Sequence, residues 1–100
     1  MSRYKVFYLP IAERDLSDIL EYVSRDRPSA ASGLLDAIDE AISRLEEFPF
    51  SGVVPADAYL QRLGYRVSVV DKILVFYVVK NKIVEIRRIL HGARRYEFLL

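Results

Sequence analysis

Apolar residues recur at helical spacing through the amino-terminal half of the chain and in strand-like runs through the carboxy-terminal half. The run from Tyr4 to Leu9 is rich in residues that favour a pleated, half-buried surface, and Pro10 after it suits the first turn of a helix. The apolar positions that follow lie three or four residues apart: Ala12, Leu16, Ile19, Leu20 and Val23. This pattern predicts a short strand and then a helix over about residues 11–24.

A second helix is predicted from Pro28 to about Phe48. Its apolar stripe is unbroken and faces away from most of its acidic residues: Ala31, Leu34, Leu35, Ile38, Ala41, Ile42, Leu45 and Phe48. Pro49 ends this helix, because the residue before a proline is pushed out of the helical conformation. The short link at residues 24–27 makes the two helices an antiparallel hairpin whose stripes pack in the core.

Three strand-like runs follow a loop-like segment at residues 50–59, and they occupy residues 65–70, 73–79 and 83–90. The first run alternates apolar and polar residues. The second is apolar at every position, which predicts a central strand that is covered on both faces. Tight links at Asp71-Lys72 and Lys80-Asn81 predict antiparallel hairpins, and Gly92 ends the last strand.

The predicted element order is therefore β-α-α-β-β-β. A small sheet must cover its apolar face, and the helical hairpin is the only material available to do so. We predict an α+β fold in which an N-terminal helical hairpin packs on one face of a small, twisted antiparallel sheet. The chain has 100 residues, of which 52% are hydrophobic, so it is long enough to bury a core as one domain over residues 1–100.

The composition excludes several kinds of site. The absence of Cys excludes disulfides, thiolate metal sites and cysteine nucleophiles. His91 is the single histidine, and the sequence has no Gly-rich phosphate loop or nucleophile motif, so we expect neither a metal nor a cofactor. No apolar run approaches the roughly 20 residues of a membrane span, and no signal-peptide pattern is present. We therefore expect a cytoplasmic protein without a membrane partner.

The net charge of +1 conceals an asymmetry between the halves. Residues 1–50 carry six Lys or Arg against ten Asp or Glu, whereas residues 51–100 carry nine against four. Six of the cations lie within residues 80–96, with Glu85 as the single acid. Such an end can meet a polyanion or an acidic protein partner. It is equally typical of an edge strand on which Lys and Arg suppress pairing with other chains.

The last strand and the tail carry the candidate chemistry. Residues 87–96 gather four guanidinium groups, one imidazole and one phenol, and Arg66 is expected to face the same region. Arginines stabilise charge in a phosphoryl transition state while His or Tyr moves protons, so these groups could cleave RNA without a metal. The same groups could equally bind an acidic protein segment through bidentate pairs.

Each of these residues also has a structural interpretation. Arg88 could lie at the rim of the core or pair with an acid of the helices, and Arg87 could pair with Glu85 on its own face. A histidine beside a glycine at a strand end, such as His91, is more often part of a turn than a catalyst. Tyr96 could anchor the tail with its ring packed and its hydroxyl in water.

The whole chain resembles the RelE/ParE superfamily, the toxins of bacterial type II toxin–antitoxin pairs. The segments that carry the resemblance are specific in their order and spacing: Leu9–Leu16, Tyr22, Phe48–Gly52, Tyr65-Arg66, Leu74–Tyr77 and Ile89–Arg95. The resemblance implies the same β-α-α-β-β-β fold. It also implies a growth-inhibiting toxin of a plasmid-stabilisation type of module, neutralised in a hetero-oligomeric complex by a cognate antitoxin.

The superfamily contains two mechanisms: RelE-like members cut messenger RNA in the ribosomal A site, and ParE-like members poison DNA gyrase. The cutting pattern has a Lys pair where this chain has Arg66 and Ser68, and an Arg where it has Ile73 or Leu74. Because two cations are missing, we favour the ParE-like interpretation, with gyrase as partner and without enzymatic activity. The target-binding candidates are then Arg87, Arg88, Arg94 and Arg95.

The alternative is a ribosome-dependent endoribonuclease acting on mRNA in the 70S ribosome, with Arg66, Arg88, His91, Arg94 and Tyr96 as catalytic candidates. A third hypothesis is an inactive binding module. In any of these cases the antitoxin is expected to bind the apolar helical hairpin as a helix in a groove, or the exposed sheet edge as an added strand.

Overall fold

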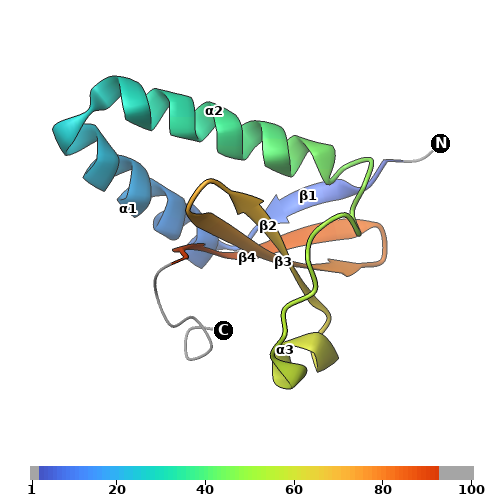
Figure 1. Ribbon diagram of the computed structural model, residues 1–100. Coiled ribbons are helices and arrows are strands. Elements are labelled where there is room, and N and C mark those ends of the chain that lie inside the picture. Colours follow the sequence, from blue (N-terminus) through green and yellow to red (C-terminus); the bar gives the residue numbers. More distant parts are fainter. Residues whose placement is uncertain (1–2, 93–100) are drawn as a thin grey trace.

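The computed structural model describes residues 3–92, which form a helical hairpin packed on one face of a four-stranded sheet (Figure 1). The elements are β1 (Lys5–Tyr8), α1 (Pro10–Asp26), α2 (Pro28–Arg44), α3 (Ala58–Arg62), β2 (Tyr65–Val70), β3 (Ile73–Lys80) and β4 (Ile83–His91). The predicted α+β class and its β-α-α-β-β-β order are confirmed.

The sheet has the strand order β1-β4-β3-β2. The β2–β3 and β3–β4 pairs are antiparallel hairpins, as the tight links predict, but β1 pairs parallel with β4, so the sheet is mixed. The crossover explains this. The hairpin carries the chain away from β1 and back across one face, and the three-stranded meander then places its last strand beside the first. The all-apolar β3 is an inner strand, as predicted.

Both long helices begin at a proline, because the missing N–H of proline costs nothing at the first helical position. Helix α1 extends slightly beyond the predicted range, and α2 ends at Arg44 rather than near Phe48. The residues of α2 that contact the sheet are buried at helical spacing: Ile38, Ala41 and Ile42, followed by Leu45 after the helix. The sequence stripe thus identifies the packed face and overestimates the length of the helix.

Two hydrophobic clusters lie on opposite faces of the sheet. The larger one joins the hairpin to Val75, Tyr77 and Ile86. The smaller one gathers Leu60 of α3 against Phe76 and other residues on the face that the hairpin leaves free. Helix α3 was not predicted, because residues 50–59 have the composition of a loop. It begins after Asp57, whose carboxylate accepts a hydrogen bond from the backbone N–H of Leu60 at 3.0 Å.

Strand β4 contains a bulge that the alternation pattern does not reveal. Phe76 lies opposite Arg88 and Tyr77 lies opposite Ile86, so Arg87 is the extra residue without a partner in β3. Because the bulge shifts the alternation by one, Ile86 and Ile89 both pack under the hairpin while Leu90 joins the other cluster.

The loop after α2 is held against the sheet by hydrogen bonds. Gly52 donates its backbone N–H to the hydroxyl of buried Tyr77 at 2.9 Å. Val53 and Val67 exchange two backbone hydrogen bonds of 2.8 Å, which form an antiparallel bridge on the outer edge of β2. Burial raises the pKa of the Tyr77 phenol, although the Gly52 N–H and the Arg66 charge oppose this rise. The loop is therefore a fixed part of the structure.

We predict that a methyl group added at Gly52 destabilises the protein, because its Cβ would overlap the Tyr77 hydroxyl and approach Val67 O to 2.9 Å. The expected loss for Gly52→Ala is about 1–3 kcal/mol of unfolding free energy. Gly33 in α2 has open space around it, so Gly33→Ala should instead stabilise by about 0.5–1 kcal/mol. Urea unfolding of both variants measures the two shifts, and equal stability of Gly52→Ala and the parent would contradict the packing described for this loop.

Candidate functional site

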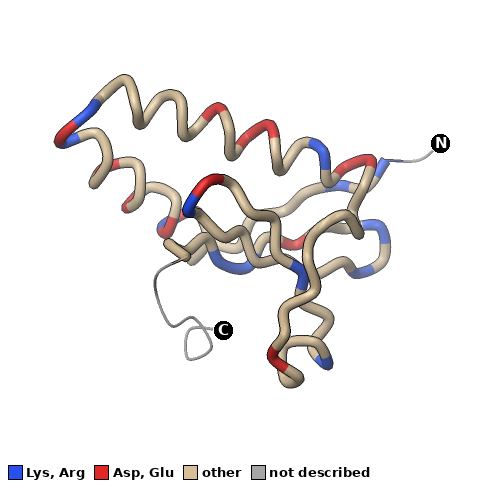
Figure 2. The backbone as a smooth tube through the Cα atoms, viewed as in Figure 1, with Lys and Arg blue, Asp and Glu red and all other residues tan. Residues whose placement is uncertain are grey.

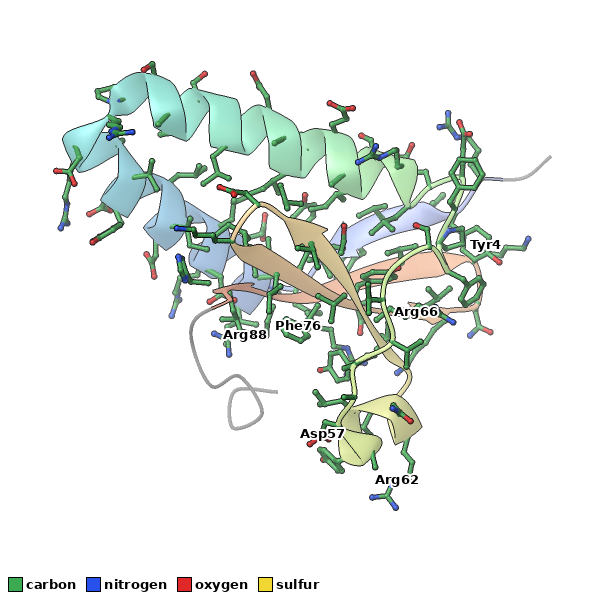
Figure 3. All side chains as sticks on the ribbon, in the orientation of Figure 1. Tyr4, Asp57, Arg62, Arg66, Phe76 and Arg88 are labelled. Carbon is green, nitrogen blue, oxygen red and sulfur yellow. The ribbon has the colours of Figure 1, made fainter. Side chains whose placement is uncertain are left out.

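The charge asymmetry of the sequence becomes a separation in space. Figure 2 shows acidic residues along the outer sides of the two long helices, whereas basic residues gather on the turn that joins β3 to β4 and along β4. Lys80 and Lys82 flank that turn, and Lys5 is the register partner of Ile83 beside it. The predicted cationic surface therefore has at least two parts, because Arg88 lies toward the other end of the sheet (Figure 3).

Arg88 is bound to Asp15 of α1 through a bidentate ion pair. Its Nε and Nη2 lie 2.7 and 2.8 Å from the two carboxylate oxygens of Asp15, and one of those oxygens also accepts the backbone N–H of Ile89 at 3.0 Å. Both side chains are largely buried, with 15% and 13% exposed. Hydrogen bonding to Asp15 raises the pKa of Arg88 despite its partial burial. This geometry confirms the structural interpretation in which Arg88 pairs with an acid of the helices.

Arg87 also makes the contact proposed for its structural interpretation. Its Nε lies 2.7 Å from Oε1 of Glu85, two residues earlier on the same strand. Its guanidinium lies 5.6 Å from the centre of the Tyr65 ring on the face away from the helical hairpin. Burial opposes the charge, but the hydrogen bonds with Tyr65 and Glu85 outweigh it and raise the pKa of Arg87.

Arg66 lies on the other face of the sheet from Arg87. In β2, Tyr65 and Val67 pack in the smaller cluster, so Arg66 between them points to the hairpin side. Its Nη1 donates to the backbone oxygens of Phe50 and Gly52 at 3.0 and 3.1 Å. In Figure 3, Arg66 lies near Tyr4 and well away from Arg88. The expectation that Arg66 faces the region of Arg87 and Arg88 is therefore wrong, because the register places it on the opposite face.

The remaining candidates lie at and beyond the end of β4. His91 is exposed and lines a groove beside α1. Arg94, Arg95 and Tyr96 lie outside the described residues, so their predicted roles stay predictions. Within residues 3–92, no group of three or more His, Asp or Glu side chains is placed to hold a metal ion.

Two of the grooves that border helix α1 combine it with other elements. One, of about 560 Å³, lies between α1 and the strand ends and is lined mainly by apolar groups, including Ile19, Tyr22 and Ile73. The other, of about 440 Å³, contains Tyr8 of β1 together with Glu13 and Asp39. Burial, with the negative charges of Asp39 and Glu13, raises the pKa of the Tyr8 phenol. The sequence stripes did not identify these grooves, because each combines residues from separate elements.

The sequence and the fold both match those of known proteins. The sequence profile described as "ParE toxin of type II toxin-antitoxin system, parDE" matches residues 6–96, which is most of the chain. The chain belongs to this ParE toxin family. The predicted RelE/ParE membership is thus confirmed, and the chain is a toxin of the type II toxin–antitoxin class. No curated protein sequence matched the chain.

Two solved toxin–antitoxin structures contain a chain whose fold is similar to that of this ParE family member. A chain of the chromosomal ParDE toxin–antitoxin system from P. aeruginosa is 19% identical, with a TM-score of 0.73 over 88% of this chain and 95% of that one. A chain of the RelBE2 toxin–antitoxin complex from Mycobacterium tuberculosis is 21% identical, with a TM-score of 0.65 over 94% of this chain and 97% of that one. Neither of the described long helices is apolar and long enough to cross a membrane.

We predict that Asp15→Ala destabilises this ParE family member strongly, because it leaves the guanidinium of Arg88 and the N–H of Ile89 without their acceptor. The expected loss is about 2–4 kcal/mol of unfolding free energy. The matched control is Glu21→Ala, which removes the exposed partner of Arg25 and should cost well under about 1 kcal/mol. Thermal and urea unfolding measure both, and a similarly small loss in the two variants would show that the buried pair does not hold α1 to β4.

Proposed function

We propose that the chain is a growth-inhibiting toxin whose target is DNA gyrase and whose activity is blocked by a cognate antitoxin. The observation that carries the choice of gyrase over RNA cleavage is the placement of the arginines. A metal-free nuclease needs several cations around one phosphate. Here Arg66 is hydrogen-bonded to the carbonyls of Phe50 and Gly52 on one face, while Arg88 is bound to Asp15 at the other end of the sheet.

The sequence departures support the same choice. Ser68, and Ile73 or Leu74, stand where the RNA-cutting pattern of the superfamily has cations, and His91 lies beside the α1 groove. Arg87, together with the tail residues Arg94 and Arg95, is the set that we assign to contact with the target. Arg88 contributes by holding β4 in place rather than by offering its charge.

We expect the purified chain to inhibit gyrase supercoiling at micromolar concentration and to accumulate cleaved DNA. Arg87→Gln should weaken this inhibition, whereas Arg62→Gln, an exposed arginine on α3, should leave it unchanged. Agarose-gel supercoiling and cleavage assays measure both effects.

Primer extension on translated messages after induction provides the opposing test. Cuts at fixed codon positions, together with an absence of gyrase inhibition, would replace the gyrase proposal by the ribosome-dependent nuclease. Growth arrest that is retained after Arg94→Ala would remove that residue from the proposed contact set.

For the antitoxin, we propose the apolar groove between α1 and the strand ends as the binding surface for a helix. The Tyr22 side chain at its rim is 71% exposed, and its neighbours Ile19, Val23 and Ile73 are aliphatic. An amphipathic helix buries its apolar face in a groove of this kind. The open edge of β1 offers a second surface for an added strand, since β1 pairs with β4 on one side only.

We predict that Tyr22→Glu weakens antitoxin binding, because it places a carboxylate at the rim of the apolar groove. The expected loss is about tenfold or more in the dissociation constant. Tyr59→Glu, at another exposed tyrosine, on α3, is the matched control. Calorimetric titration with the antitoxin measures both variants, and equal affinities would move the binding surface away from this groove.

A further inference from the structure

Two aromatic rings between two cations form a continuous row at the end of the molecule where β3 turns into β4. The Nζ of Lys82 lies 4.9 Å from the centre of the Tyr4 ring, and the Tyr4 and Phe50 rings meet edge to face at 6.4 Å. The guanidinium of Arg66 lies 5.3 Å from the centre of the Phe50 ring. This row, Lys82–Tyr4–Phe50–Arg66, brings together four segments that are distant in the sequence, and Figure 3 shows Tyr4 and Arg66 on this side.

The Phe50 ring is exposed although its backbone is fixed. Its side chain is 56% exposed, and its carbonyl accepts a hydrogen bond from Arg66. Two residues later, the backbone N–H of Gly52 donates a hydrogen bond to the Tyr77 hydroxyl, which restricts the conformation of this loop. One exposed ring is ordinary on a protein surface, but Phe48, two residues earlier, is exposed as well, so this loop presents two rings together.

A hollow of about 290 Å³ lies beside this row. It is lined by Arg44 at the end of α2, by the Phe48 ring, which is itself 60% exposed, and by the hydroxyl-bearing residues Ser51 and Ser68. Ser68 follows Arg66 by two residues on β2 and therefore lies on the same face. Within residues 3–92, the guanidinium of Arg44 makes no hydrogen bond or ion pair.

The charge around the row and the hollow favours an anion. Lys5, Lys80 and Lys82 are exposed next to the turn. Glu46 and Glu47 lie at this end as well, and Arg3 contacts them at 3.5 and 2.9 Å and so offsets one of their two negative charges. A ligand here meets exposed positive charge, exposed rings and hydroxyl groups together.

We propose that this end of the molecule binds single-stranded nucleic acid. Unpaired bases stack on exposed aromatic rings, and a cationic groove follows their phosphates without reading a sequence. Phe50 and Phe48 supply the stacking surfaces, and Arg44 supplies a phosphate contact beside them. An acidic peptide would use the cations and leave the two exposed rings without a role, so it is the less favoured ligand. A duplex would hide the base faces that these rings could contact.

Arg66 acts here as a positioning residue. Its guanidinium donates to two carbonyl oxygens and lies over the Phe50 ring, so it orients the ring that we propose as a stacking surface. This assignment differs from its role in the nuclease hypothesis, and it requires no cleavage of the bound strand. The proposal is also independent of the gyrase proposal, because it concerns the chain alone.

Fluorescence anisotropy with a labelled single strand of about 12 nucleotides, as DNA and as RNA, tests the proposal with the purified full chain. We expect Phe50→Leu to weaken binding by about 5- to 50-fold at every salt concentration, since it removes one stacking surface. Phe50→Tyr keeps an aromatic ring at this position and should bind about as tightly as the parent chain. Arg44→Gln should lower the slope of log affinity against log salt by about 0.7, because one phosphate contact is lost.

The matched controls are Tyr59→Leu and Arg62→Gln, which remove an exposed ring and an exposed arginine from α3 and should change neither quantity. Unfolding curves show whether each variant keeps the fold. The proposal is overturned if no binding is seen up to about 100 μM chain at low salt. It is also overturned if a duplex of the same sequence binds as tightly as the single strand, or if the α3 controls lose as much affinity as Phe50→Leu. Tighter binding of RNA or of DNA identifies which kind of strand is preferred.

Discussion

The carboxylate of Asp15 joins helix α1 to strand β4. It does so beyond the point where β1 ends and β4 continues without that neighbour. The parallel ladder of β1 with β4 ends at Tyr8 and Ile86, and the chain then turns into α1. Farther along β4, the N–H of Ile89 faces the place that a longer first strand would have filled, and Asp15 accepts its hydrogen bond instead. A buried carboxylate is costly without a cation, and Arg88 supplies one in bidentate geometry. The bulge at Arg87 sets the register in which both contacts are possible.

This arrangement changes how the arginines of β4 should be interpreted. Clustered arginines suggest a catalytic or ligand-binding surface, but a guanidinium whose donors are committed to a buried carboxylate stabilises no charge on a substrate. The same reasoning applies to Arg66, which fixes the loop around Phe50. In both places, the cation acts on the fold, and the fold presents other groups to a partner. The target contacts of the basic half are therefore sought in residues other than Arg66 and Arg88.

The sequence predicts those parts of the fold that depend on local patterns. Helical spacing identifies α1 and α2, and the uninterrupted apolar run identifies β3 as an inner strand. Other features depend on contacts that no local pattern contains. Leu60 is buried by Phe76 and its neighbours, so α3 is stabilised by tertiary packing rather than by its own composition. The alternating sequence of β4 gives no sign of the bulge at Arg87. Without knowledge of the bulge, the face of the sheet on which Arg88 lies cannot be derived. For the same reason, the sequence could suggest an acidic partner for Arg88 without indicating which acid it is.

The two proposed surfaces lie at different positions along β3. The apolar groove beside α1 includes Ile73 at the start of this strand, while the row of rings and cations runs from Lys82 in the turn after β3 to Arg66, the register partner of Tyr77. The four residue steps from Ile73 to Tyr77 span about 13 Å at about 3.3 Å per residue, which is about the diameter of one helix. An antitoxin helix seated in the groove therefore leaves Phe50 uncovered unless the partner continues across the sheet. The acidic outer sides of the helices would also repel a polyanion, which confines nucleic acid to the turn end. The separation of charge between the two layers thus keeps the two kinds of partner apart.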